Sequence, residues 1–513
     1  MTHRSHLFIA LFAVFMITQC SSVLAAYVEP AGWADLPVEE LSAVHGDNSA
    51  RLQAAVDRAT VNGGRIRLKK GTYELANVVL KSNVHLEVEA GTVIAPYAGG
   101  SGTVNIFSVG GGPDAEVQHV SFRGIGGRFS INYPSDFTRN SRAFAVSNID
   151  NLLIRDIDIT ENYTKFSAIA LLLPGGSTLK SHRAKNVTVT QVSLLHSSYG
   201  YSLVQANTGQ DMLFSHLIAT DAGVTVRVET DLESNNLYNI GVDNISIQNV
   251  TNVNGNAAVF MQPHSIANGD VRVDGVVAIE SSAGVVIFKN NGRFPDLPDG
   301  SFGSGSYVRN VSVVYGMDTP MNYARIKYMP PSLIPLAQRE PDGAPSAYRG
   351  PSATAVINLL PDQVSVNYSD ITHSGPNLSE YLKIVEIERR NGSSGLLHWD
   401  NFISRYSLSG SPTIDSDSDG LNDWGEYLKG GNPTNSAHRG VPPVINPYAG
   451  NIVFSLVGDR HVSCEILTNT NLMSNTWDTN TTIQVTTDNG IMNSYTNTIN
   501  VAEDQLFIKL IVE

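Results

Sequence analysis

A short strand-like unit returns along most of this chain and restricts the available folds more than any other feature. Each copy begins with a polar residue, often Asn, and continues with apolar residues at alternate positions, as in NVHLEV (83–88), NVTVTQV (186–192) and NISIQNV (244–250). Such alternation is typical of a β-strand with one buried face. Eight copies lie between residues 83 and 316, and they start roughly every 25 to 40 residues. This irregular spacing argues against a propeller or a leucine-rich repeat.

The spacing favours an all-β solenoid, a right-handed, single-stranded parallel β-helix in which variable loops with Gly, Asn and Asp turns join successive coils. An array of β-sandwiches is the alternative that the pattern leaves open. Residues 48–60 carry apolar side chains at helical spacing, with Asn48 or Ser49 as the N-cap. We expect this helix to cap the open N-terminal end of a solenoid that covers residues 26–400.

Two later segments depart from the solenoid pattern. Residues 317–349 are rich in Pro and aromatic residues, and we expect an ordered excursion beside a groove of the solenoid, with an ordinary surface loop as the alternative. The character of the sequence changes after about residue 408. The tail, residues 443–513, has short alternating segments and is predicted to form a small accessory module that resembles a β-sandwich.

Between these parts, the segment DSDSDGLNDWGE (415–426) has the residue spacing of an EF-hand-type calcium loop. In such a loop, oxygen ligands surround one hard cation and a glycine at the sixth position, here Gly420, makes the turn. We predict a structural Ca²⁺ within a linker at residues 408–436, and no organic cofactor; a disordered acidic linker is the alternative. The predicted ligands are the side chains of Asp415, Asp417, Asp419, Asp423 and Glu426 and the carbonyl of Leu421.

The N-terminal residues indicate export. An apolar run from Leu7 to Ile17 follows a basic start, and a small-residue cleavage pattern ends near Ala25, so residues 1–25 are predicted to be a signal peptide of a secreted, extracellular protein. Only Cys464 remains after cleavage, which leaves no intrachain disulfide. The net charge of −14 argues against a nucleic-acid partner, and no later apolar run is long enough to span a membrane. We expect a monomer.

The stretch TVRVETD (225–231) alternates charged and apolar residues. In a strand, Arg227, Glu229 and Asp231 would share the outer face while the intervening residues point into the solenoid. A rise of two residues would separate the Glu229 and Asp231 positions by about 6.5–7 Å, a spacing that lets water sit between acid and base in an inverting glycosidase. A solvated charged face without chemistry is the alternative.

Several segments together resemble the iota-carrageenases of glycoside hydrolase family 82. They are SNVHLEVEAGTVIAP (82–96), YGYSLVQ (199–205), VRVETD (226–231), FMQPHSIANGDVRV (260–273) and GPSATAVIN (350–358), which occur in the family's order within residues 40–370. The resemblance implies an inverting, endo-acting hydrolase that cuts β-1,4 links of iota-carrageenan, a galactan sulfated on both sugars of its repeat.

The resemblance also implies roles for single residues. Glu229 would be the general acid and Asp231 the general base, Gln205 would hold the attacking water or an ion bridging to it, and His264 would support the acid or the substrate. A general acid must carry a proton near neutral pH, so we expect burial or the charge of Asp231 to raise the pKa of Glu229. Arg227 would oppose this, and we expect it to lean toward Asp231 or a substrate sulfate. Further candidate sulfate contacts are Lys289, Arg293, Arg325, Lys327 and Arg349.

Some family members carry a long insertion that folds over the cleft, after the strand that corresponds to AGVVIF (283–288). Here only residues 289–306 fill that space, so we expect a more open groove. Three competing hypotheses remain. They are a polygalacturonase-like pectinase, for which RIK at 325–327 is a short match, a polysaccharide lyase that uses calcium and a basic residue, and a non-catalytic glycan-binding solenoid or adhesin.

Overall fold

The computed structural model describes residues 26–386 apart from residues 100, 342, 343 and 345, and shorter stretches between residues 408 and 512. The predicted signal peptide, residues 1–25, lies outside the described residues. Among the described residues, no helix combines the length and the apolar content needed to cross a membrane.

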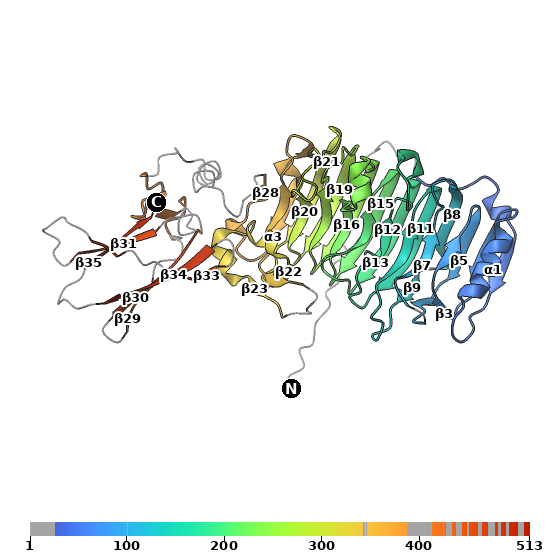
Figure 1. Ribbon diagram of the computed structural model, residues 1–513, viewed down its shortest axis with the longest axis horizontal. Coiled ribbons are helices and arrows are strands. Elements are labelled where there is room, and N and C mark those ends of the chain that lie inside the picture. Colours follow the sequence, from blue (N-terminus) through green and yellow to red (C-terminus); the bar gives the residue numbers. More distant parts are fainter. Residues whose placement is uncertain are drawn as a thin grey trace.

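Successive coils of the chain build two long parallel sheets that share one apolar core (Figure 1). The larger sheet runs in the order β1 (Val38–Leu41), β2 (Gly64–Leu68), β5 (Val84–Glu89), β8 (Val117–Ile125), β11 (Ile149–Thr160), β13 (Lys185–Leu195), β15 (Gly209–Thr220), β17 (Val242–Val253), β19 (Val271–Ile279), β21 (Ser306–Val314) and β26 (Val364–Val366). Four further strands extend it, namely β3 (Thr72–Leu75), β6 (Val93–Pro96), β9 (Phe129–Asn132) and β27 (Ile371–Ser374).

The second sheet contains one strand from each of ten coils. Its order is β4 (Val78–Leu80), β7 (Val104–Val109), β10 (Ser141–Val146), β12 (Ile169–Leu171), β14 (Ser202–Ala206), β16 (Val224–Glu229), β18 (Ala257–Gln262), β20 (Ala283–Ile287), β25 (Thr354–Asn358) and β28 (Ile384–Val385). Strands from consecutive coils pair in parallel, as in β14 with β16 and β16 with β18. The predicted parallel β-helix is therefore confirmed, and the sandwich array is wrong for this part of the chain.

The polar residue that opens the repeated unit has a conformational role. Asn83, Asn151, Asn186 and Asn244 all have a positive φ, between 52° and 70°. Asn tolerates this left-handed region better than most residues other than Gly. The recurring Asn therefore marks the same local turn into the strand in successive coils of the larger sheet.

The helix α1 (Ser49–Ala59) covers the N-terminal end of the solenoid, as predicted (Figure 1). Its apolar face, with Leu52, Ala55 and Val56, is buried against β2 and β4. Asn48 is the N-cap residue, but its side chain bonds to the preceding loop rather than to the helix. The helix thus shields the edge apolar layer of the first coils from solvent.

The excursion at residues 317–349 contains regular elements outside residues 342, 343 and 345. Its elements are β22 (Thr319–Met321), α3 (Tyr323–Ile326), the 3₁₀ turn η3 (Pro331–Leu336), β23 (Gln338–Arg339) and β24 (Tyr348–Gly350), and its three strands form a small antiparallel sheet. The position of this excursion beside a groove stays a prediction. The remaining helical turns are η1 (Trp33–Asp35), η2 (Lys180–His182), α2 (Glu233–Leu237), η4 (Tyr368–Asp370) and η5 (Leu378–Glu380).

The C-terminal tail contains two antiparallel sheets. One runs in the order β29 (Val444–Tyr448), β30 (Asn451–Asp459), β34 (Met492–Asn500) and β33 (Gln484–Asp488), and the other in the order β32 (Asp478–Asn480), β31 (Cys464–Asn469) and β35 (Phe507–Val512). The β-rich character of the tail agrees with the sequence. The packing of the two sheets as a sandwich stays a prediction, and the predicted boundary near residue 400 lies outside the described residues.

Candidate active site

Three neighbouring strands of the second sheet bring the motif residues into one row. Gln205 of β14 lies beside Arg227 of β16, which lies beside Phe260 of β18. Val226 and Val228 are at most 2% exposed and belong to the core. The predicted alternation of inward apolar and outward charged residues in β16 is therefore confirmed for this strand.

Glu229 is the last residue of β16 and lies at the centre of a polar cluster. Only 5% of its side chain is exposed. Arg227 Nε donates to Glu229 Oε2, and His264 Nε2 lies 2.8 Å from Glu229 Oε1. Gln205 Nε2 donates to the backbone carbonyl of Glu229 at 3.4 Å. The chain thus brings together Gln205, Glu229 and His264, three of the four residues that the family resemblance assigned to catalysis, from three separate coils.

Further side chains that the sequence reasoning missed hold Gln205 in place. Its Oε1 accepts a hydrogen bond from Ser167 Oγ at 2.9 Å, and its Nε2 lies 3.3 Å from Asn207 Oδ1. Ser167 comes from the coil before, so its position follows from the register of the coils. Asn207 lies two residues after Gln205 and could have been found from strand alternation.

Arg227 is also held from two sides. Its Nη1 donates to the carbonyl of Gly200 at 2.6 Å, and its guanidinium lies 5.2 Å from the ring centre of Phe260. Both partners belong to motifs that resemble the family, YGYSLVQ and FMQPH. Alignment of the coils would have placed Phe260 beside Arg227, because the two residues are in register.

Opposing influences set the pKa of Glu229. Burial raises it, but the positive charge of Arg227 and the hydrogen bonds from His264 and Arg227 outweigh burial and lower the pKa to about 2. The expected raised pKa is therefore wrong for the ligand-free site. The expectation that Arg227 leans toward Asp231 is wrong as well, because side chains two residues apart on one strand face the same side and Arg227 reaches Glu229 first.

Asp231 lies in different surroundings from Glu229. The strand ends at Glu229, so the rise of an extended strand does not fix the separation of the two carboxylates. The Asp231 side chain is 44% exposed, and its Oδ2 lies 3.3 Å from Arg293 Nη1. Asp231 and Arg293 line an open pocket of about 730 Å³ together with Glu233, Phe294 and Asp296 among others.

The short segment at residues 289–306 forms one wall of this pocket and also covers His264. Phe294 packs edge-on against the His264 ring, with 6.0 Å between ring centres. Gly300 N donates to the His264 carbonyl at 2.8 Å, and a Cβ at Gly300 would lie only 2.8 Å from that oxygen. Glycine is therefore required at position 300 for this close approach.

The remaining candidate sulfate contacts do not form one group. Arg325 is 1% exposed and is enclosed between Phe260 and Phe288, 5.3 and 4.6 Å from their ring centres. A direct sulfate contact is therefore wrong for Arg325 in this structure. Its guanidinium group instead contacts the ring of Phe260, which the guanidinium group of Arg227 also contacts.

Arg349 faces a separate, smaller pocket of about 110 Å³ and pairs with Asp318, with 2.8 Å between Nε and Oδ1. Lys327 Nζ lies 5.2 Å from the ring centre of Tyr328. Lys289 follows the strand β20, and its carbonyl accepts a hydrogen bond from Gln262. Arg227 contacts Glu229 and Arg293 contacts Asp231, so two of the predicted cations pair with the candidate catalytic carboxylates.

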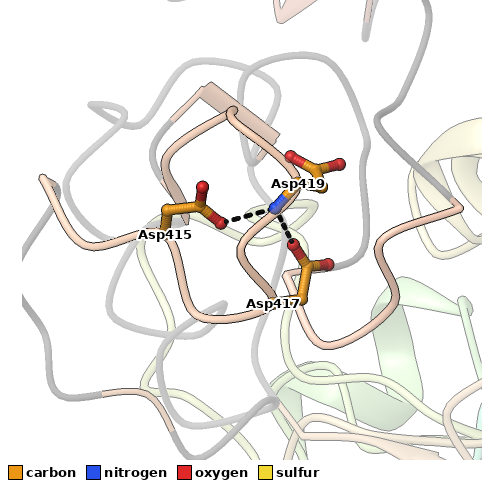
Figure 2. Close-up of side chains that lie close together, drawn as sticks. All are labelled: Asp415, Asp417 and Asp419. Carbon is orange, nitrogen blue, oxygen red and sulfur yellow. Dashed lines mark hydrogen bonds between the residues drawn. The ribbon is translucent and has the colours of Figure 1, made fainter.

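A second cluster of carboxylates lies in the acidic loop. Asp415, Asp417 and Asp419 can each bring an oxygen within 4.8 Å of the others (Figure 2). Asp423 and Glu426 of the same loop are 1% and 0% exposed. Three of the predicted metal ligands, Asp415, Asp417 and Asp419, are therefore close together in space as well as in sequence.

No family model matches the chain. It is 31% identical over 296 residues to an iota-carrageenase of Zobellia galactanivorans, covering 54% of this chain and 58% of that protein. It is 30% identical over 243 residues to an iota-carrageenase of Alteromonas macleodii, covering 47% of this chain and 49% of that protein. The chain thus spans about half the length of these curated relatives.

Among solved structures, the chain has the fold of the iota-carrageenase of family GH82 from A. fortis, with a TM-score of 0.63 and 22% identity over 73% of this chain and 94% of that one. An iota-carrageenase complexed to iota-carrageenan fragments matches with a TM-score of 0.61 and 21% identity, over 73% and 96% of the two chains. Sequence relatives and shared fold together confirm the resemblance of this chain to the iota-carrageenases of family 82.

Proposed function

We propose that this protein is a secreted, endo-acting glycoside hydrolase that cleaves the β-1,4 links of iota-carrageenan with inversion. The observation that carries the proposal is a pair of carboxylates in opposite surroundings. Glu229 is almost fully buried and held by His264, whereas Asp231 is half exposed and borders an open pocket. An acid and a base that act on opposite sides of one glycosidic bond need different surroundings, because one carboxyl must hold a proton while the other is ionised.

Each motif residue then has one task. Glu229 gives its proton to the leaving glycosidic oxygen, and Asp231 takes a proton from the water that attacks the anomeric carbon from the opposite face. Gln205 lies beside the end of β16, where it can orient that water. His264 fixes the Glu229 carboxyl through its contact with Oε1. After the reaction Glu229 is ionised and Asp231 is protonated, and exchange with solvent restores both.

The ligand-free site leaves Glu229 ionised near neutral pH, because Arg227 and His264 stabilise its charge. A substrate sulfate offers several oxygens that suit the donors of a guanidinium group. When a sulfate draws Arg227 away from Glu229, the charge and the hydrogen bond of Arg227 no longer oppose burial, which is the largest single influence and raises the pKa of the carboxyl. Glu229 therefore takes up its proton when sulfated substrate is bound.

Purified full-length protein incubated with iota-, kappa- and lambda-carrageenan and with polygalacturonate tests the proposal. Reducing ends and the ultraviolet absorbance of unsaturated ends are both measured. We expect reducing ends from iota-carrageenan without unsaturated ends, and their loss in Glu229→Gln and Asp231→Asn. Asp57→Asn, which removes a carboxylate from α1 far along the chain from the site, serves as the matched control with full activity.

Other outcomes would replace the proposal by one of its competitors. Reducing ends from polygalacturonate alone would indicate a pectinase, and unsaturated ends would indicate a lyase. Binding of carrageenan without cleavage, unchanged in Glu229→Gln, would indicate a glycan-binding solenoid.

A further inference from the structure

A buried carboxylate without a partner lies at the end of the acidic loop, residues 415–426. Glu426 is 0% exposed, and neither of its carboxylate oxygens has a hydrogen-bond partner among the described residues. Oδ2 of Asp417 is likewise buried and without a partner. Buried carboxylates are normally paired or coordinate a metal, so three such oxygens in one loop require an explanation.

Two other acidic side chains of the loop, Asp415 and Asp417, converge on one backbone group. Figure 2 shows the carboxylates of Asp415 and Asp417 both directed at the backbone N–H of Asp419, at 3.1 and 3.2 Å. Gly420 N donates to the second oxygen of Asp415 at 2.8 Å, and the φ of +90° at Gly420 permits this turn. The backbone therefore holds these carboxylates together although their charges repel.

The loop has no cation of its own, since the sequence from Thr413 to Glu426 contains neither Lys nor Arg. All five ionisable side chains of this segment are carboxylates, and that of Glu426 is buried. The charge that would compensate these groups must therefore come from outside the loop.

Asp423 differs from the other acidic residues of the loop. Its Oδ1 accepts a hydrogen bond from Ser416 N at 2.9 Å, and its Oδ2 accepts one from Ser416 Oγ at 2.7 Å. Its own N–H donates to the carbonyl of Ile414 at 2.7 Å. Asp423 thus ties the end of the loop to its beginning, and we assign it to positioning rather than to the predicted ligand set.

We propose that residues 415–426 bind one calcium ion and that Glu426 supplies two of its ligands. The complete ligand set is the side chains of Asp415, Asp417, Asp419 and Glu426 and the carbonyl of Leu421. Six oxygens, two of them from one carboxylate, suit Ca²⁺, whereas Mg²⁺ requires a nearly ideal octahedron and retains water ligands. The absence of His and Cys from the segment argues against zinc.

Calorimetric titration of the chelator-treated full-length protein with CaCl₂ alone tests this site. We expect one saturable site per chain, with a dissociation constant within the range of roughly 10⁻⁷ to 10⁻³ M known for loops of this kind. Glu426→Gln and Asp417→Asn should each remove that site. Ser416→Ala should weaken binding by about tenfold, because it removes a partner of the positioning residue Asp423.

Asp362→Asn, which removes an exposed carboxylate outside the loop, is the matched control and should bind calcium like the parent. Circular dichroism of each variant establishes that it is folded. Absence of saturable binding in the parent would overturn the proposal, as would equal binding by the parent and by folded Glu426→Gln or Asp417→Asn. Saturation by MgCl₂ at the same concentration would overturn the assignment to calcium. None of these readouts depends on polysaccharide cleavage.

Discussion

Glu229 and Glu426 are both almost inaccessible to solvent, yet the chain surrounds them with opposite charges. Glu229 contacts Arg227 and His264, and its pKa falls to about 2. Glu426 lies among carboxylates without a partner, and its pKa rises to about 8. The same side chain therefore has two different electrostatic states that depend on its neighbours alone.

The difference shows how each site is completed. The solenoid supplies the cations that compensate Glu229, so this carboxyl is held in place before any ligand arrives. Under the proposed function, a sulfated substrate competes for Arg227 before Glu229 acts as an acid. The acidic loop lacks a compensating cation, so a metal ion has to supply the charge that holds Glu426 in place. In this account, the site of Glu229 becomes active when the carboxyl loses its contact with Arg227. The acidic loop is completed when its carboxylates gain a contact with a metal ion.

The largest expected effect is a difference in activity between variants of Glu229 and variants of Glu426. Glu229→Gln should lower kcat on iota-carrageenan by about 10²–10⁴-fold, because it removes the general acid. Glu426→Gln should leave the initial rate unchanged well below the unfolding temperature, because the residues of the candidate active site lie within the solenoid. Initial rates of reducing-end release from both variants provide the comparison. An equal loss of initial rate in the two variants would contradict the assignment of different roles to Glu229 and Glu426.

The next effect concerns stability in acid. The pKa of Glu229 lies at about 2 in the folded chain instead of the ordinary 4.5, so its ionisation stabilises the fold above pH 4.5. This stabilisation, on the order of 3 kcal/mol, is lost as the pH falls from 4.5 through 2. Urea unfolding of the parent and of Glu229→Gln across this pH range measures it.

The free-energy difference between the parent and Glu229→Gln should shrink as the solution is acidified. Arg227→Met should remove most of this stabilisation, because burial then raises the pKa of Glu229 without opposition from the guanidinium group. A difference between the parent and Glu229→Gln that does not change with pH would show that the carboxyl is not held in its ionised form.

Calcium should stabilise the acidic loop by a somewhat smaller amount. A ligand at a hundred times its dissociation constant stabilises the folded form by about 2.7 kcal/mol. We therefore expect CaCl₂ to raise the temperature at which the acidic loop unfolds in scanning calorimetry, and Glu426→Gln to abolish this shift. A shift of the same size in Glu426→Gln would mean that calcium acts elsewhere on the protein.

The smallest effect concerns the exposed pair of Asp231 and Arg293. Both side chains are about half exposed, so their ion pair should contribute only about 0.2–1 kcal/mol to stability. Arg293→Ala should raise KM for iota-carrageenan more than it lowers kcat, because Arg293 borders the pocket without touching Glu229. A loss confined to kcat would instead assign Arg293 to the chemical step.

The sequence predicts the solenoid well because each coil repeats the same local requirements. The left-handed Asn and the alternating apolar residues recur in coil after coil, so neighbouring coils support the same interpretation. Gln205, Glu229 and His264 could be brought together only through the family resemblance, since their proximity depends on coil register.

Features that depend on packing between distant parts of the chain could not be predicted from the sequence. The burial of Arg325 follows from how the excursion at residues 317–349 covers Phe260 and Phe288. Arg227 pairs with Glu229 and not with Asp231 because the strand β16 ends at Glu229, and the alternation of residues alone does not show where the strand ends. In the acidic loop, spacing alone selected Asp423 as a ligand, whereas its bonds to Ser416 depend on how the loop closes.

Proton NMR of the first product released from iota-carrageenan tests the central claim most directly. Inverting hydrolysis of a β-1,4 link predicts that the α-anomer of the new reducing end forms first and that the β-anomer follows by mutarotation. Glu229→Gln should give neither signal over the same period. Initial formation of the β-anomer, or product formation by Glu229→Gln at the rate of the parent, would contradict the assignment of Glu229 and Asp231 as acid and base.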